Sequence, residues 1–213
     1  DPERQEGPHA HSINIDPKNN FALVPDLGLD KVLIFKLDLE NGQLIPNDIT
    51  HGSVEPGSGP RHLDFHPSGE LVYVLNEISA TITAFSYNQD TAEMKEIETV
   101  STLPKNFSTK SCADIHISND GKFVYASNRG HDSIVIFNIN QDNGKMEYVD
   151  HQSSCGRSPR NFGIDPKGNF LLAANQDSSD IYSFKIDKGS GSLSATGFSL
   201  KVPYPVCLKF LKK

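Results

Sequence analysis

The sequence predicts an all-β fold, a β-propeller built from four-stranded antiparallel blades. A strand–turn–strand pattern recurs four times, and no stretch of the 213 residues shows helical periodicity. The repeats begin at His11, Arg61, Ala113 and Arg160. Their spacing of roughly 50 residues is typical of one propeller blade.

The first two strands of each repeat form a hairpin. Apolar residues alternate along the first strand, as at Leu63 and Phe65 or Ile115 and Ile117, with the period of two that a half-buried strand requires. A turn follows in every repeat. One residue that tolerates a left-handed backbone stands at the same column of each turn: Asn19, Gly69, Gly121 and Gly168.

A third apolar strand is expected over residues 31–37, 81–87, 133–139 and 180–186, each followed by a polar turn and a weaker fourth strand. The blades then lie near 11–60, 61–112, 113–159 and 160–205, and a last strand over 205–210 is expected to close the ring by completing the first blade. Residues 1–213 are therefore one propeller domain or the C-terminal part of one, and we favour the second alternative.

Composition excludes several classes of protein. There are 27 acidic and 20 basic residues, a net charge of -7, which argues against a general nucleic-acid binder. No apolar run approaches the roughly 18 residues of a membrane-spanning helix, so no membrane partner is expected. The three cysteines are widely spaced, which favours a reduced, cytoplasmic chain without a cofactor.

Two columns of polar residues flank the hairpin turns at equal distance. The column before the turn holds His11, Arg61 and Arg160, and the column after it holds Glu77, Arg129 and Gln176. In an antiparallel hairpin such positions face one another, so Arg61 is expected opposite Glu77 and Arg160 opposite Gln176. All six side chains should therefore converge on one mouth of the propeller channel.

These residue types suit reactions of small anions. His11 titrates near neutral pH and is the candidate general base. Arg61, Arg129 and Arg160 can clamp phosphate or carboxylate and stabilise an oxyanion. Glu77 is either a second acid or base or the residue that holds the arginines in place.

The histidines of the first two repeats offer an alternative, a metal site. His9, His11, His62 and His66 lie close together in the sequence. The set lacks a cluster of carboxylate and amide oxygens, and His66 belongs to a hairpin turn, so no metal is expected.

Several segments resemble one family of enzymes. They are PHAHS, DLGLDKV, GPRHLDFHPSG, NE at 76–77, SNDGKFVYASNR and SPRNFGIDPKGNFLLAANQ. In order and spacing the chain resembles the propeller-type 6-phosphogluconolactonase family, which includes the fungal 3-carboxy-cis,cis-muconate lactonizing enzymes. The resemblance implies a seven-bladed ring, of which this chain is about four blades. It also implies a catalytic set of His11, Arg61, Glu77 and Arg129, with Arg160 and Gln176 binding substrate.

The resemblance implies a carboxylic ester hydrolase of the pentose phosphate pathway of carbohydrate metabolism. Its partner would be a small anionic lactone, 6-phosphoglucono-δ-lactone, which it would hydrolyse to 6-phosphogluconate. The alternatives are a 3-carboxymuconate cycloisomerase and a non-catalytic propeller that binds a ligand through the same mouth.

Overall fold

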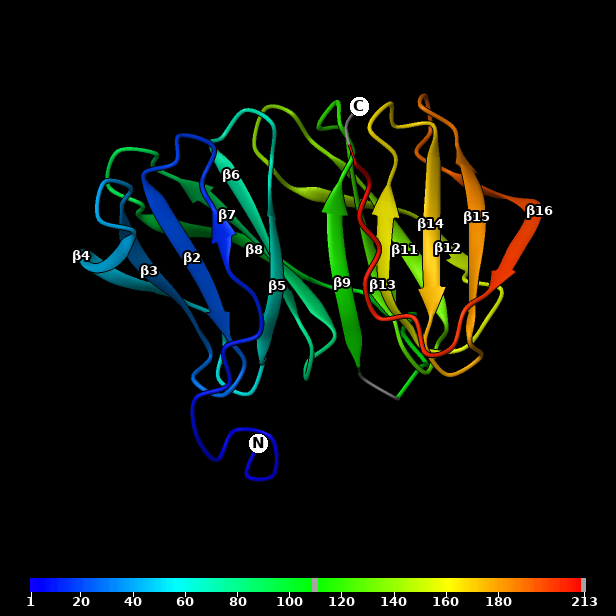
Figure 1. Ribbon diagram of the computed structural model, residues 1–213, viewed down its shortest axis with the longest axis horizontal. Coiled ribbons are helices and arrows are strands. Elements are labelled where there is room, and N and C mark those ends of the chain that lie inside the picture. Colours follow the sequence, from blue (N-terminus) through cyan, green and yellow to red (C-terminus); the bar gives the residue numbers. More distant parts are fainter. Residues whose placement is uncertain (109–110, 212–213) are drawn as a thin grey trace.

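The computed structural model describes residues 1–108 and 111–211, so the predicted unit over 1–213 includes four positions outside the described residues. Within the described ranges the chain forms sixteen β-strands and no helix. Each group of four consecutive strands makes one antiparallel sheet, and the four sheets stand side by side as an arc of blades (Figure 1). The all-β prediction and the prediction of four-stranded blades are confirmed. The described part of the chain holds no helix with the length and apolar character needed to cross a membrane.

The strands follow one another in sequence order within every blade. The first blade contains β1 (Asn14–Ile15), β2 (Phe21–Asp26), β3 (Lys31–Asp38) and β4 (Gln43–Ser53). The second contains β5 (Pro60–Phe65), β6 (Leu71–Asn76), β7 (Thr81–Tyr87) and β8 (Met94–Ser101). The third contains β9 (Cys112–Ile117), β10 (Phe123–Asn128), β11 (Ser133–Ile139) and β12 (Met146–Ser153). The fourth contains β13 (Pro159–Ile164), β14 (Phe170–Asn175), β15 (Asp180–Ile186) and β16 (Leu193–Lys201).

Burial changes from the middle of each blade to its outer strand. Residues of the central strand β10 are buried on both faces, because a neighbouring blade packs against each side of the sheet. The outer strands β8 and β12 consist mostly of exposed and half-buried residues and carry several acidic side chains. The first strands β5, β9 and β13 lie next to one another along the inner side of the arc.

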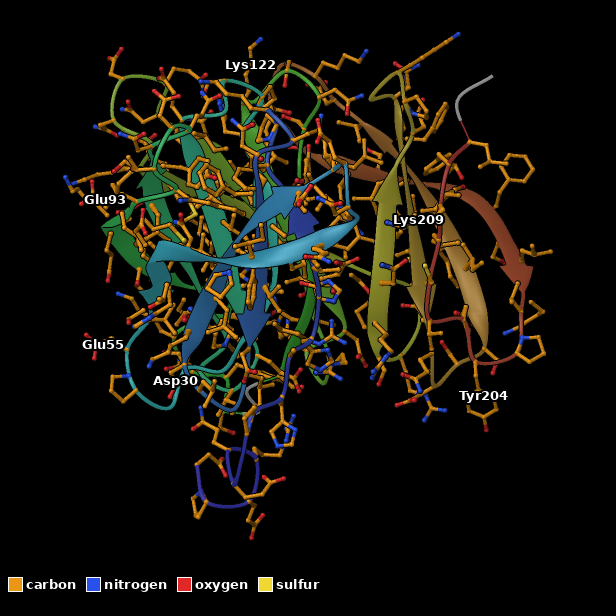
Figure 2. The ribbon with its side chains drawn as sticks, turned by 60° about the vertical axis from the view of Figure 1, so that its left-hand side comes forward. Asp30, Glu55, Glu93, Lys122, Tyr204 and Lys209 are labelled. Atoms are coloured by element: carbon orange, nitrogen blue, oxygen red, sulfur yellow. The ribbon has the colours of Figure 1, made fainter. Side chains whose placement is uncertain are left out.

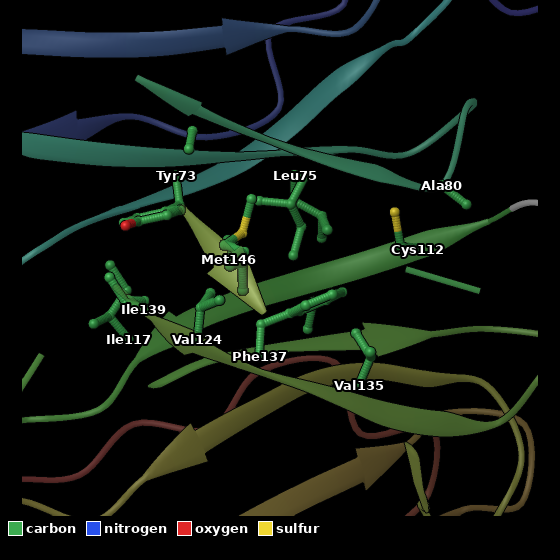
Figure 3. Packing of buried hydrophobic residues seen from close by; sticks show 14 of the residues in the cluster. Tyr73, Leu75, Ala80, Cys112, Ile117, Val124, Val135, Phe137, Ile139 and Met146 are labelled. Carbon is green, nitrogen blue, oxygen red and sulfur yellow. The ribbon is translucent and has the colours of Figure 1, made fainter. Parts of the chain in front are cut away.

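The hydrophobic core is divided into layers between neighbouring blades. One layer joins the second and third blades and includes the fully buried side chains of Tyr73, Leu75 and Val124 (Figure 3). Equivalent layers join the first blade to the second and the third to the fourth. Burying a large apolar side chain contributes about 1.5–3 kcal/mol, so this repeated packing holds the blades in one arc.

The hairpin turns have the backbone that the sequence predicted. Asn19 has φ 57°, and Gly69, Gly121 and Gly168 have φ 75°, 76° and 65°. These angles lie in the left-handed region, which glycine and asparagine adopt most readily. The shared column in the sequence therefore corresponds to one recurring turn.

Two predictions about the ends of the chain are wrong. Ile13 and Ile15 are the alternating apolar residues at the start of the first repeat, where the sequence pattern predicts a half-buried strand. They are 56% and 44% exposed, because no other described blade packs against that face. Residues 205–210 form no strand and do not complete the first blade. They run along β13 at the opposite end of the arc, where the Leu208 N–H donates to Asn161 Oδ1 at 2.6 Å (Figures 1 and 2). A bond to a side chain replaces the expected backbone ladder.

The predicted register at the mouth is also wrong by about one residue. Pro60 pairs with Asn76 and His62 with Leu75, so Arg61 is the extra residue of a β-bulge and is not opposite Glu77. The same irregularity leaves Arg160 unpaired between Pro159 and Asn161. A bulge breaks the alternation of side chains and turns the extra residue in a new direction.

Candidate active site

The buried carboxylate of Glu77 is the centre of the mouth. Its Oε2 lies 2.8 Å from Arg61 Nε, and its Oε1 lies 3.0 Å from Arg129 Nη2. Arg4 Nη2 donates to the same Oε1 at 2.7 Å. Arg61 and Glu77 are only 3% and 4% exposed. Three arginines from three parts of the chain therefore share one carboxylate.

The charges of this cluster shift its pKa values. Burial by itself raises the pKa of Glu77, but the hydrogen bond from Arg4 and the charges of Arg129 and Arg61 lower it overall. The pKa of Arg61 is lowered, mainly by burial, although the charge of Glu77 opposes this. Glu77 is thus held ionised as the counter-charge of the arginines.

His11 lies at the edge of the same cluster. Its side chain is 31% exposed, and its Nε2 is 3.9 Å from Glu77 Oε2, which is an ion-pair distance and not a hydrogen bond. Burial and the neighbouring charge of Arg61 lower the pKa of His11, while the charge of Glu77 acts in the opposite direction. The imidazole is therefore neutral at pH 7 and able to accept a proton.

Arg160 and Gln176 lie in the fourth blade at the same mouth. The charge of Arg160 is close enough to Arg61 to contribute to lowering its pKa. The backbone N–H of Gln176 donates to Ser158 O at 2.9 Å, which places this residue just beyond the end of β14. Both side chains are partly exposed, and neither makes a side-chain hydrogen bond among the described residues.

Sequence reasoning missed Arg4. Arg4 stands in an irregular segment before the first repeat. This segment has no alternation of apolar residues, so no pattern in the sequence indicated that Arg4 belongs to the mouth. The segment is held because Gln5 Nε2 donates to Leu27 O at 2.8 Å and because Gly28 lets the backbone of Gly7 approach closely. A Cβ on Gly28 would lie 1.8 Å from Gly7 O.

A second group of polar residues lines the inner strands behind the arginines. His62 Nε2 lies 2.9 Å from Arg61 Nη1, and His62 Nδ1 lies 2.6 Å from Asp114 Oδ1. His116 Nε2 is 3.3 Å from Asp114 Oδ2. The alternation of β5 and β9 does indicate that His62 and Asp114 share the channel side. Their contact joins two different blades, however, and no local sequence pattern predicts a contact between blades.

The histidines of the first two blades make separate contacts. His66 contacts Ser68 and the carbonyl of Gly121 in the hairpin turns. Within residues 1–108 and 111–211, no group of three or more His, Cys, Asp or Glu side chains is arranged to hold a metal ion.

The Gly57–Pro60 segment, with its Gly-Ser-Gly-Pro sequence, connects β4 to β5. Asp30 accepts the N–H groups of Gly57 and Gly59 at 2.7 and 2.8 Å, and Figure 2 shows Asp30 at this end of the blades. The segment is therefore a tight connection between the first and second blades.

Comparison with known proteins gives consistent results. The chain is 42% identical over 210 residues to a 6-phosphogluconolactonase of Bacillus subtilis, covering 98% of this chain and 59% of the relative. It is 42% identical over 192 residues to a 6-phosphogluconolactonase of Formosa agariphila, covering 89% and 54%. The chain thus spans less than two thirds of the length of these curated relatives.

Solved structures share the same fold. A crystal structure from Bacteroides fragilis, described as a candidate 6-phosphogluconolactonase, superposes with a TM-score of 0.93 at 39% identity and covers 100% of this chain and 60% of its own. A periplasmic gluconolactonase of Pseudomonas aeruginosa superposes with a TM-score of 0.91 at 32% identity, covering 98% and 58%. The model of the family "Lactonase, 7-bladed beta-propeller" matches residues 1–210. The chain therefore belongs to the family of seven-bladed β-propeller lactonases.

Proposed function

We propose that this chain carries the catalytic mouth of a lactonase that hydrolyses 6-phosphoglucono-δ-lactone to 6-phosphogluconate. The observation that carries the proposal is the charge of the mouth. Arg4, Arg61 and Arg129 contact the carboxylate of Glu77, and the charge of Arg160 also acts on Arg61, so four arginines outnumber the two carboxylates of Glu77 and Asp114. Positive charge in excess on a protein of net charge -7 favours a small anionic ligand.

The proposed reaction begins with water activated by His11. The neutral imidazole accepts a proton from water while the water oxygen attacks the lactone carbonyl carbon. Glu77 Oε2, 3.9 Å from His11 Nε2, stabilises the imidazolium that forms. When the bond between the carbonyl carbon and the ring oxygen breaks, the imidazolium returns the proton to that oxygen, which becomes a hydroxyl group.

Arg61 and Arg129 are proposed to stabilise the tetrahedral oxyanion and bind the phosphate. Arg129 Nη2 is engaged by Glu77 and by the carbonyl of Cys112, while its buried Nε has no hydrogen-bond partner among the described residues. Donors fixed before the reaction stabilise developing charge without reorganising. Arg160 and Gln176 have side chains free for the sugar hydroxyls or the phosphate.

The test is hydrolysis of 6-phosphoglucono-δ-lactone above its spontaneous rate, by this chain and by a version extended to the length of its relatives. Arg129→Ala should lower kcat/KM at least tenfold, while Lys36→Ala, on the outer part of the first blade, should leave it unchanged. Glucono-δ-lactone, which lacks the phosphate, should react more slowly. Equal rates with both lactones, or full activity in Arg129→Ala, would contradict the proposal. Turnover of 3-carboxymuconate alone would favour a cycloisomerase.

We also propose a reducing compartment, the cytoplasm, for this protein. Cys112, Cys155 and Cys207 are free thiols, and the latter two are exposed. Exposed unpaired thiols are typical of proteins kept in reducing surroundings.

A further inference from the structure

We propose that Asp114 and His62 are positioning residues for Arg61: Asp114 fixes the tautomer of His62, and the neutral His62 aims the guanidinium of Arg61 into the mouth. The inference rests on the proposed function in one respect, namely that Arg61 contacts the substrate. The geometry of the three side chains stands independently of which lactone is bound.

The tautomer of His62 follows from its contact with Asp114. His62 Nδ1 lies 2.6 Å from Asp114 Oδ1. Burial alone raises the pKa of Asp114, but the neighbouring His116 and His62 lower it well below its usual range, so the side chain is a carboxylate. A carboxylate only accepts hydrogen bonds. The proton of His62 therefore sits on Nδ1, and Nε2 carries the lone pair.

The lone pair of His62 meets a group that can only donate. Arg61 Nη1 lies 2.9 Å from His62 Nε2, and a guanidinium has no acceptor. The contact is attractive only while His62 is neutral with its proton on Nδ1. In the opposite tautomer, two N–H groups would face each other at this distance.

The remaining contacts fix Arg61 on two further sides. Its Nη1 also donates to the carbonyl of Ala113, and its Nε lies 2.8 Å from Glu77 Oε2. Its Nη2 has no partner within the part of the chain that the structure describes. The guanidinium is thus held by the hydrogen bonds of Nη1 and by the opposite charge of Glu77, although the buried Nε makes no hydrogen bond among the described residues, and Nη2 stays available to a ligand.

Asp114 is itself held rigidly by the next blade. It is 2% exposed, and its Oδ2 accepts from the backbone N–H of Phe162 at 3.2 Å and from the side chain of Asn161. His116 Nε2 approaches the same oxygen at 3.3 Å. Residues of β5, β9 and β13 therefore act together to orient one arginine. The hydrogen bonds of these buried polar groups could be satisfied without a network that ends on Arg61.

Nitrogen NMR of the 213-residue chain tests the proposal directly, because the ring nitrogen shifts of His62 distinguish the two neutral tautomers. We expect the Nδ1–H form at pH 7 in the wild type and a shift toward the Nε2–H form in Asp114→Asn, whose amide can donate to Nδ1. The Nε–Hε signal of Arg61 should exchange with water several-fold faster in His62→Leu. It should stay protected in His62→Gln, whose side-chain oxygen can still accept from Nη1.

Binding of 6-phosphogluconate provides a second measurement. Loss of one hydrogen bond to a charged group should weaken binding about tenfold in His62→Leu, and His62→Gln should restore most of it. His51→Leu is the matched control, because the His51 ring contacts Thr50 on the outer strand β4 and no residue of the mouth, and it should bind as the wild type does.

The outcomes separate this inference from the proposed function. An Nε2–H tautomer in the wild type, or an Arg61 signal unchanged in His62→Leu, would overturn the inference even if the lactone is hydrolysed. The Nδ1–H tautomer with an Arg61 signal that depends on His62 would support the inference even if no lactone is hydrolysed, and the proposed function alone would then fail.

Discussion

Replacing Glu77 with alanine should destabilise the protein more than any other change at the mouth. It leaves Arg61, which is 3% exposed, without its counter-charge. Removing one partner of a buried ion pair costs about 3–5 kcal/mol. Arg4, whose side chain is 50% exposed, adds about 1 kcal/mol or less.

Urea unfolding measures this loss. With a slope of about 3 kcal/mol per molar urea, the midpoint should fall by about 1–2 M. Glu96→Ala on the exposed face of β8 is the control and should change stability by no more than about 0.5 kcal/mol. The double variant Arg61→Met/Glu77→Leu should be more stable than Glu77→Ala, because it also removes the buried charge of Arg61 and leaves only the more exposed Arg129 without its partner.

The pH dependence has a defined sign. The pKa of Glu77 is lower in the folded state than its ordinary value, so its stabilising contribution is present above the unfolded-state pKa and is lost as the pH falls through the folded-state pKa. The stability difference between wild type and Glu77→Gln should therefore shrink in acid. A Glu77→Ala variant within 1 kcal/mol of the wild type, or a double variant no more stable than the single one, would refute this reasoning.

Three further results are expected. Gly28→Ala should push the segment that carries Arg4 away from the mouth, because the new Cβ would lie 1.8 Å from Gly7 O. Tryptic cleavage after Arg4 should then become several-fold faster. Gly7→Ala, with open space around its Cβ, should leave the rate of cleavage unchanged. The kcat/KM of the lactonase reaction should decline in acid with an inflection below about 6.5, the ordinary pKa of histidine. Burial and the charge of Arg61 lower the pKa of His11, and the neutral imidazole is the base. An inflection above that value, or one that persists in His11→Gln, would exclude His11 as the general base. Iodoacetamide should label the exposed Cys155 and Cys207 in the native protein but not Cys112, because burial raises the pKa of that thiol to about 12; mass spectrometry of the labelled peptides would show any exception.

The fold could be predicted from the sequence because the pattern of strands and turns is local and repeated. The expected third strand over 81–87 coincides with β7, since an apolar run bounded by polar turns suffices to define it. The register at Arg61 could not be predicted, because a bulge leaves the composition of the strand unchanged and shifts only its pairing. Residues 205–210 have a strand-like sequence, but pairing depends on a partner strand that the sequence pattern does not identify.

The candidate site was predictable where it follows the repeat and unpredictable where it does not. Arg61, Glu77 and Arg129 stand in shared columns, and the structure brings them together. Arg4 lies outside any repeat, and Asp114 reaches His62 from 52 positions further along the chain. Such contacts depend on how neighbouring blades are juxtaposed, which no single repeat encodes.

The bulge at the start of the inner strands has a consequence for how this fold can acquire new specificity. A residue without a ladder partner can change identity at little cost to strand pairing, since no cross-strand neighbour has to change with it. Arg61 and Arg160 are the bulge residues of the second and fourth blades. In the third blade the extra residue is also on the inner strand, where Ala113 and Asp114 of β9 together face the one residue between Ala126 and Asn128 of β10. A change of ligand charge would therefore require a change at Arg61 together with its buried partner Glu77, but no change in the strand pairing of the blade.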